Sequence, residues 1–210
     1  MLRVLIADDH PIVREGLKQI VNETRDIVVA GEASNGEELL NKLKEGNYDV
    51  VVLDITMPGR NGVDILRQLR SERPQLPVLM LSIHPEEQYA LRVLRAGASG
   101  YLTKESAQDE LVLAIRKVSR GGKYISSSLA EKLAFELEVG HEQAPHEALS
   151  DREYQVMCMI ASGKTVMEIA QEISLSEKTI STYRSRILEK MKMKNNAELT
   201  YYAIKNQLVA

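Results

Sequence analysis

The first 120 residues alternate short apolar runs with longer segments in which apolar residues recur every three or four positions. Two runs, DVVVLD at 49–54 and LPVLML at 76–81, are continuously apolar, which is typical of central parallel strands buried on both faces. The pattern predicts strands near 2–7, 26–31, 49–53, 77–82 and 100–103, and helices near 11–22, 36–46, 62–73, 86–96 and 106–120. Five strand–helix units of this length imply right-handed crossovers and a flavodoxin-like, doubly wound five-stranded parallel sheet of the α/β class.

Beyond this region the pattern contains helices but no further strands. A short helix is predicted near 127–138, and the segment 139–148 is predicted to be a linker because it is poor in apolar residues and contains a Gly, a Pro and two His. We therefore expect an α/β domain over 1–121, a short helix and linker over 122–147, and an all-α four-helix domain over 148–210.

The four helices of the C-terminal part are predicted from periodicity and capping residues. The first begins after Ser150, which forms a capping box with Glu153 three residues later. The other three lie near 165–173, 177–193 and 196–207. In the middle pair Ser176 is placed to cap the second helix. The predicted core of this pair consists of Ile169, Ala170, Ile173, Ile180, Ile187 and Leu188.

Composition excludes a membrane-spanning protein and favours a cytoplasmic one. The content of 44% hydrophobic and 27% charged residues is ordinary for a globular chain. No apolar run approaches the roughly 20 residues that cross a bilayer. The N-terminus lacks a signal-peptide pattern, because Asp8 and Asp9 interrupt its apolar run early. A single cysteine, Cys158, excludes an internal disulfide and fits a reducing compartment.

Charge is distributed unevenly along the chain. Residues 1–143 contain 18 Lys and Arg against 22 Asp and Glu, whereas residues 144–210 contain nine against eight. Residues 177–194 contain six basic residues and only two acidic ones. An acidic N-terminal part and a locally basic helix indicate that the two halves have different partners.

Polar residues stand where the predicted strands end. Asp8 and Asp9 follow the first strand, Asp54 ends the third, Ser82 the fourth, and Lys104 follows the fifth. The carboxyl ends of parallel strands meet at one edge of a sheet, so we expect these five side chains to converge there. A helix cap would explain only one of the two adjacent aspartates.

Three carboxylates in one crevice repel each other unless a cation is bound between them. A hard divalent ion with oxygen ligands, such as Mg²⁺, meets this need. The segment DITMPGRNG at 54–62 adds a sharp turn at Pro58 and Gly59, which we expect to direct the backbone carbonyl of Thr56 toward the same ion. The sequence therefore predicts a magnesium site formed by Asp8, Asp9, Asp54 and Thr56.

These strand-end residues, together with Met57-Pro58-Gly59 and Tyr101, resemble the receiver domain of bacterial two-component response regulators over residues 1–120. The resemblance implies that Asp54 accepts a phosphoryl group from a sensor histidine kinase. It implies that Asp9, Asp54 and the Thr56 carbonyl bind Mg²⁺, while Asp8 helps through water.

The resemblance also assigns roles to three further residues. Lys104 and Ser82 are expected to contact the phosphoryl oxygens, and Tyr101 is expected to swing inward when Ser82 moves. Serine stands at position 82 where threonine is commoner in receivers, but the hydroxyl group is retained.

The segment TVMEIAQEISLSEKTISTYRSRILEKM at 165–191 predicts two helices joined by a tight turn. Its second helix exposes short hydroxyl side chains and cations on one face. That composition suits insertion into a DNA groove, where Ser and Thr reach base edges and Arg and Lys meet phosphates. A solvated helix in a small bundle is the alternative interpretation of this segment taken alone.

Residues 148–208 resemble the LuxR-type helix-turn-helix through LSDRE, IASGKT, EIAQEISLSEKTIS and ILEKM. Together with the receiver, the chain is similar to NarL/FixJ-type response regulators, and its C-terminal half is similar to their GacA/UvrY and BvgA branches. The resemblance places base contacts at Ser181, Thr182 and Ser185. It places contacts to the DNA backbone or neighbouring groups at Lys178, Thr179, Tyr183 and Arg184.

We therefore expect a transcriptional regulator that is not an enzyme. Phosphorylation is expected to release its helix-turn-helix module and to pair it, as a homodimer, on a double-stranded DNA operator. A lone module with few cations binds DNA weakly, and pairing two modules raises their effective concentration. The last helix offers a small interface through Leu199, Tyr202, Ala203 and Asn206, which recur at helical intervals.

Two other interpretations fit the sequence less well. A phosphoaspartate hydrolase of the haloacid dehalogenase type is the alternative for the N-terminal half, but it expects a second Asp two residues after the nucleophile, where Thr56 stands. The segment SGKT at 162–165 resembles a phosphate-binding P-loop, but Cys158 occupies the position at which that loop needs Gly.

Overall fold

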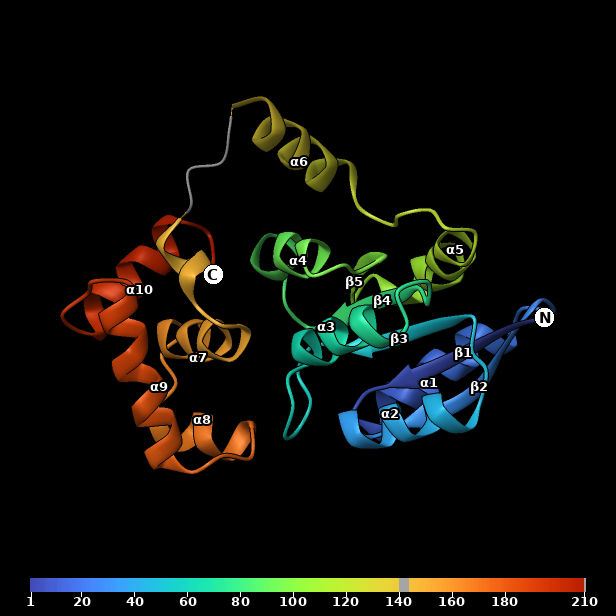
Figure 1. The fold of residues 1–210 in the computed structure, drawn as a ribbon, viewed down its shortest axis with the longest axis horizontal. Coiled ribbons are helices and arrows are strands. Elements are labelled where there is room, and N and C mark those ends of the chain that lie inside the picture. Colours follow the sequence, from blue (N-terminus) through green and yellow to red (C-terminus); the bar gives the residue numbers. More distant parts are fainter. Residues whose placement is uncertain (140–143, 210) are drawn as a thin grey trace. The chain divides into compact units, whose positions relative to one another are not determined.

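The computed structural model describes residues 1–139 and 144–209. Residues 140–143, which belong to the predicted linker, lie outside the described residues. The chain divides into two compact units, Met1–Leu133 and Ala134–Ala210 (Figure 1). None of the helices in the described ranges is both long enough and apolar enough to cross a membrane.

The first unit is built on one parallel sheet with the strand order β2-β1-β3-β4-β5. Its strands are β1 (Leu2–Ala7), β2 (Ile27–Ala33), β3 (Val50–Asp54), β4 (Val78–Ser82) and β5 (Gly100–Thr103). Strands β3 and β4 are buried at every residue, as their continuous apolar runs predict. The strand order and the parallel pairing confirm the predicted flavodoxin-like fold.

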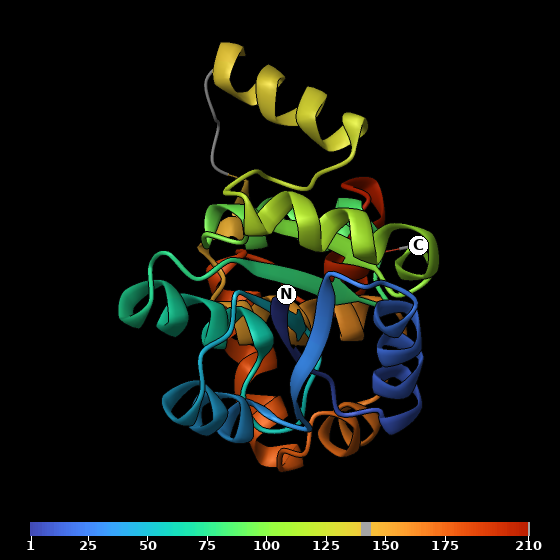
Figure 2. The ribbon, with the colours of Figure 1, turned by 90° about the vertical axis from the view of Figure 1, so that its right-hand side faces the viewer.

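Helices lie on both faces of this sheet (Figure 2). They are α1 (Pro11–Asn22), α2 (Gly36–Glu45), α3 (Gly62–Glu72), α4 (Glu86–Arg95) and α5 (Ala107–Ser119). Leu17 of α1 and Leu111 of α5 share one core with alternate residues of the strands, including Val4, Ile6 and Leu79. Strand residues of the opposite parity point to the other face. The sheet is thus buried between two layers of helices, which hold its carboxyl-end edge in place.

After α5 the chain returns to the outer edge of β5 and pairs with it. Tyr124 forms an isolated parallel bridge with Gly100, and its carbonyl accepts a hydrogen bond of 3.1 Å from the backbone N–H of Tyr101. A Cβ atom on Gly100 would lie only 2.6 Å from that carbonyl oxygen, so glycine permits the close approach. We call residues 123–126 the strap, and helix α6 (Ser127–Val139) begins directly after it.

The second unit is helical. It contains a 3₁₀ turn, η1 (Pro145–Ala148), and the helices α7 (Asp151–Ala161), α8 (Val166–Glu172), α9 (Glu177–Lys190) and α10 (Asn196–Lys205). The predicted capping box at the start of α7 and the predicted Ser176 cap of α9 are both present, which confirms these predictions. Thr165 and Glu168 form a second capping box at α8 that sequence analysis missed. All six predicted core residues of α8 and α9 are buried.

The predicted interface on α10 is wrong for two of its four residues. Leu199 and Ala203 are completely buried, and the hydroxyl of Tyr202 lies 2.8 Å from Nδ1 of His146 in η1. The large exposed apolar residues of α10 are instead Tyr201 and Ile204, which are 70% and 55% exposed. Helical spacing identifies an apolar face, but it does not show whether the core of the same unit already covers that face.

Candidate functional site

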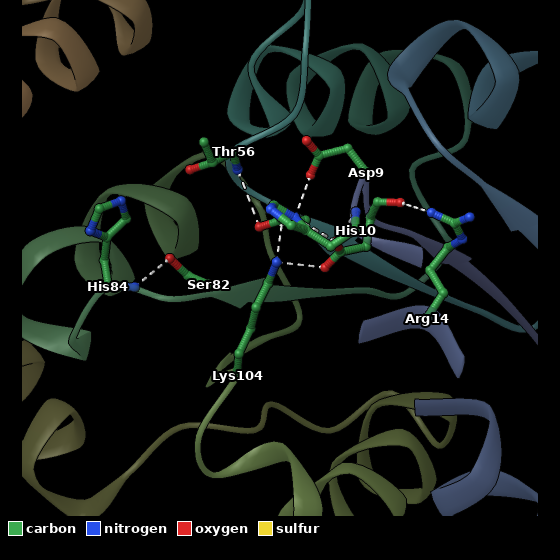
Figure 3. Close-up of polar contacts among 9 residues, drawn as sticks. Asp9, His10, Arg14, Thr56, Ser82, His84 and Lys104 are labelled. Carbon is green, nitrogen blue, oxygen red and sulfur yellow. Dashed lines mark hydrogen bonds and ion pairs between the residues drawn. The ribbon is translucent and has the colours of Figure 1, made fainter. Parts of the chain in front are cut away.

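The carboxyl ends of β1, β3 and β5 bring acidic and basic side chains together at one edge of the sheet (Figure 3). Nζ of Lys104 lies 2.6 Å from Oδ2 of Asp8 and 2.8 Å from Oδ2 of Asp54. Both aspartates are at most 1% exposed. Ligand atoms of Asp8, Asp9, Asp54 and His10 all lie within 4.8 Å of one another. The structure thus brings together all the acidic side chains that the sequence placed here.

The two adjacent aspartates after β1 are held by contacts other than helix capping. The residue that precedes α1 is His10, and its side chain makes no cap hydrogen bond. Its backbone N–H donates instead to Oδ1 of Asp8 at 2.8 Å. Nη1 of Arg14 donates to the backbone carbonyl of Asp8 at 2.6 Å, as Figure 3 shows. Arg14 and His10 therefore support the acidic cluster, and sequence analysis identified neither.

The loop after β3 folds back over the phosphoacceptor candidate. Gly59 has φ +78°, so the predicted sharp turn is present and needs glycine. A Cβ atom on Gly62 would lie 2.2 Å from the backbone oxygen of Asp54, so only glycine allows α3 to begin so close to the strand. The backbone N–H of Thr56 donates to Oδ1 of Asp54 at 3.2 Å. This bond and the Lys104 ion pair orient the two oxygens of the Asp54 carboxylate.

The electrostatics of the site favour a bound cation. Burial raises the pKa of the Asp54 carboxyl, the Lys104 ammonium lowers it, and the charge of Asp8 raises it again, with a resulting pKa of about 6. Burial also opposes the charge of Lys104, but the carboxylates of Asp54 and Asp8 outweigh burial and raise the pKa of that ammonium above its ordinary value. One ammonium thus faces three carboxylates.

Two buried oxygens of the cluster have unused acceptor capacity. Oδ2 of Asp8 and Oδ1 of Asp9 lack a well-oriented hydrogen bond within the described parts of the chain. The first lies 2.6 Å from the Lys104 ammonium, and the second lies 2.8 Å from Nδ1 of His10. Hard carboxylate oxygens with free lone pairs suit a divalent cation such as Mg²⁺. The residues present therefore fit the predicted metal.

Ser82 and Tyr101 meet through one residue that sequence analysis did not single out. The Ser82 hydroxyl oxygen accepts a hydrogen bond of 3.0 Å from the backbone N–H of His84 (Figure 3). The hydroxyl of Tyr101 donates to the carbonyl of the same residue at 2.8 Å. Tyr101 is buried, and burial raises the pKa of its phenol well above the ordinary value. His84 thus joins the end of β4 to the side chain of Tyr101.

The second candidate surface is the exposed face of α9. Ile180 and Ile187 are completely buried, and the line opposite them on the helix consists of exposed residues, Lys178, Thr182, Ser185 and Glu189. A shallow depression on this side is lined by Ser176, Lys178, Thr179, Thr182, Tyr183 and Arg186. Of the residues predicted for DNA binding, Lys178, Thr182 and Ser185 thus lie on the outward side of α9. Arg186, which was not among the predicted contacts, lines the depression beside them.

Arg184 differs from the other predicted DNA-binding residues because its side chain is bonded to another helix of the unit. It is half-buried, and its Nε donates to Oδ1 of Asn196 at 2.7 Å. The bond joins α9 to the first residue of α10. Arg184 therefore supports the packing of these helices, a role that spacing along the sequence does not reveal.

Comparison with known families identifies the class of protein. Residues 4–116 match the family described as response regulator receiver domain, and residues 147–203 match bacterial regulatory proteins of the luxR family. The chain therefore belongs to the response regulators that carry a LuxR-type DNA-binding domain, and it is a transcription regulator of the two-component type. This confirms the resemblance found in the sequence.

Among characterised proteins the chain is similar to two response regulators over nearly its whole length. It is 38% identical to UvrY of Escherichia coli strain K12, over 99% of this chain and 96% of that protein. It is 39% identical to GacA of Pseudomonas protegens, over 100% of this chain and 98% of that protein. The predicted similarity to the GacA/UvrY branch is confirmed.

The chain is also similar to solved structures of RcsB over nearly its whole length. RcsB from Salmonella bound to the promoter rprA in the presence of phosphomimetic BeF₃⁻ is 25% identical, with a TM-score of 0.65 over 96% of this chain and 97% of that one. A structure described as two RcsB dimers bound to two parallel DNAs is 27% identical, with a TM-score of 0.60 over 96% of each chain.

Proposed function

We propose that Asp54 accepts a phosphoryl group from a sensor histidine kinase in the cytoplasm. One observation carries this proposal: Asp54 is a buried carboxylate with one oxygen bound by Lys104. A carboxylate forms a covalent acyl phosphate, and catalysis of the transfer rests on positioned positive charge. The ammonium of Lys104 already lies where it can balance charge on a phosphoryl group attached to Asp54.

Mg²⁺ would be held by Asp8, Asp9, Asp54 and the Thr56 carbonyl, and when bound it supplies the positive charge that this acidic cluster lacks. The chain is proposed to keep its phosphoryl group rather than to hydrolyse phosphate esters repeatedly. Support comes from position 56, where Thr56 replaces the acid that phosphoaspartate hydrolases carry.

We propose that the phosphoryl group is sensed through Ser82. A phosphoryl oxygen on Asp54 accepts the proton of the Ser82 hydroxyl and draws Ser82 toward Asp54, which strains the bond that the backbone N–H of His84 donates to the same hydroxyl. Displacement of the loop at His84 alters the carbonyl to which Tyr101 donates. The change at Asp54 is thereby passed to Tyr101 and to the start of α4.

The functional consequence of phosphorylation is proposed to be pairing of two chains on DNA, through a surface that includes Tyr201 and Ile204. Support comes from the exposure of these residues and from the dimeric DNA complexes described for RcsB. Full-length protein is expected to be monomeric and to bind DNA weakly until treated with a phosphodonor, and then to dimerise and bind tightly. Light scattering and gel shift on the same samples measure both properties. Equal affinity with and without phosphodonor would contradict the proposed switch.

A separate prediction concerns the cations on the outward side of α9 and their contribution to DNA binding. Lys178→Ala and Arg186→Ala should each weaken binding to every DNA sequence and reduce the salt slope of log K by about one unit, because each removes a cation that displaces a counterion from a phosphate. Titrations at several salt concentrations measure the slope. Lys44→Ala, which removes an exposed lysine from α2, is the control and should leave both values unchanged. Loss at only one operator sequence would contradict the assignment to phosphate contacts.

A contact between α4 and the strap is proposed to transmit the signal to the interdomain helix. The Ser126 hydroxyl donates to the carboxylate of Glu86 in the first turn of α4, and its oxygen accepts the backbone N–H of Leu129 at 3.0 Å in the first turn of α6. The strap is also paired with the backbone of Tyr101. A shift of Tyr101 and α4 therefore strains the group that caps α6.

Ser126→Ala should loosen α6 without affecting phosphorylation. Loss of an N-cap destabilises a helix by about 0.5–2 kcal/mol, which corresponds to roughly a 2- to 30-fold faster exchange of the first-turn amides of α6. Hydrogen exchange measured by mass spectrometry on the full chain gives this rate. Ser128→Ala is the matched control, because Ser128 is exposed and lies two residues further along the chain. Unchanged exchange in Ser126→Ala protein would rule out the coupling.

A further inference from the structure

Two side-chain hydroxyl groups on the outward side of α9 donate their protons to backbone carbonyls of the same helix. Oγ1 of Thr182 lies 2.9 Å from the backbone oxygen of Lys178, and Oγ of Ser185 lies 3.1 Å from the backbone oxygen of Ser181. A carbonyl oxygen carries no proton, so each hydroxyl is the donor of its bond. A hydroxyl has one proton and two lone pairs, so each presents only acceptor capacity to a partner outside the helix.

This polarity has a consequence in the major groove of DNA. Adenine and cytosine present an amino group on that edge, whereas thymine and guanine present a keto oxygen at the corresponding place. An acceptor aimed at one strand binds an amino group but faces a keto oxygen without a proton between them. To donate to a keto oxygen, the hydroxyl must give up its intrahelical bond, which is about as strong as the bond it would form.

We propose that Thr182 and Ser185 read the operator by amino-versus-keto discrimination, favouring adenine or cytosine over guanine or thymine on the strand that each one faces. The inference rests on the proposed function, because it requires the outward line of α9 to enter the major groove. Ser181 provides the internal contrast. Its exposed hydroxyl makes no hydrogen bond within the described parts of the chain, so it is able to donate or accept and should not discriminate in this way.

The discrimination is testable with the full-length protein and a small phosphodonor. Selection from a pool of randomised duplexes should yield two positions at which one strand carries adenine or cytosine. In a selected site, unsubstituted purine in place of adenine, or 2-pyrimidinone in place of cytosine, removes only the amino group. Each replacement at the Thr182 position should weaken binding roughly five- to tenfold, the effect of one neutral hydrogen bond.

Protein variants, combined with the base replacements, complete a double-mutant cycle. Thr182→Val keeps the branched shape and removes the hydroxyl, so it should lose the same factor on the natural site and show no further loss when the amino group is also removed. Thr182→Ser retains the hydroxyl and should keep the discrimination. Ser185→Ala is expected to behave as Thr182→Val does, at its own base pair.

Two results would overturn the proposal. Selection of guanine or thymine at the contacted positions would show that the hydroxyls donate. Wild-type affinity of Thr182→Val for every sequence would show that this line of the helix does not reach the bases. The preference is a ratio between sequences measured under one condition, so it stands even if phosphorylation fails to tighten binding. Failure of the switch and failure of the base preference are therefore distinguishable.

Discussion

Asp54→Asn protein is expected to take no phosphoryl group from a small phosphodonor in the presence of Mg²⁺, and its DNA binding should no longer respond to the phosphodonor. The amide keeps the size of the side chain but lacks the nucleophilic carboxylate oxygen. Intact-protein mass spectrometry counts the phosphoryl groups, and gel shift follows DNA binding. Label at the wild-type level on the variant would refute the assignment of Asp54.

Two further variants serve as a control for labelling and as a test of the role of Lys104. Asp109→Asn changes an exposed carboxylate in the first turn of α5 and should label normally. Lys104→Ala removes the ammonium that contacts both Asp8 and Asp54. The variant should still accept some phosphoryl label, but the label should no longer change DNA binding, because the ammonium that would contact the phosphoryl group beside Ser82 is gone. A Lys104→Ala protein that responds normally would remove Lys104 from the switch.

The second large effect is expected in the pH dependence of stability without divalent metal. Asp54 has a pKa of about 6 in the folded protein, above the ordinary value of 3.8. The folded state therefore binds this proton more tightly than the unfolded state. The stabilisation is fully present below pH 3.8 and is lost as the pH rises through about 6. Asp54 is 1% exposed, so solvent screens the effect little. The cost at neutral pH is about 3 kcal/mol, at about 1.4 kcal/mol per pKa unit.

Asp54→Asn should remove this cost, so in chelator the variant should exceed wild type in free energy of unfolding at pH 7.5 but not at pH 4. Urea unfolding monitored at both pH values gives the difference. Other carboxylates also make stability depend on pH: Arg116 lowers the pKa of Asp26, and the backbone of Ser34 lowers the pKa of Glu38. Their contributions are the same in both proteins, so they cancel in the difference between variant and wild type. Millimolar Mg²⁺ should narrow the gap, because metal binds and stabilises the wild-type carboxylates. Parallel pH profiles in chelator would contradict the proposed electrostatics.

Local patterns in the sequence determined the elements and the position of the site. Continuous apolar runs predicted the buried strands, and Ser150 and Ser176 predicted helix starts, because these signals depend on residues within one turn or one strand. The strand-end residues Asp8, Asp54 and Lys104 could be placed together without coordinates. In a parallel sheet the topology alone brings all carboxyl ends to one edge.

Contacts between segments distant in the sequence were decided only by the tertiary structure. The pairing of the strap with β5 and the bond from Arg184 to Asn196 each join residues 12 or more positions apart, and no periodic pattern records such a pair. The role of His84 also depends on two side chains from different strands that meet at its backbone.

The outward faces of the helices show the same division. Spacing placed Leu199 and Ala203 on one side of α10, but packing within the unit decided that this side is buried and that Tyr201 and Ile204 are exposed. Spacing likewise placed Thr182 on the outward side of α9, but the rotamer that turns its proton toward the Lys178 carbonyl is seen only in three dimensions. Sequence by itself determined which residues share a strand, a helix face or a sheet edge, because these follow from the geometry of the backbone. Only the tertiary structure decided which partner each side chain has and which atoms remain free to bind, because side-chain direction and burial depend on what packs alongside.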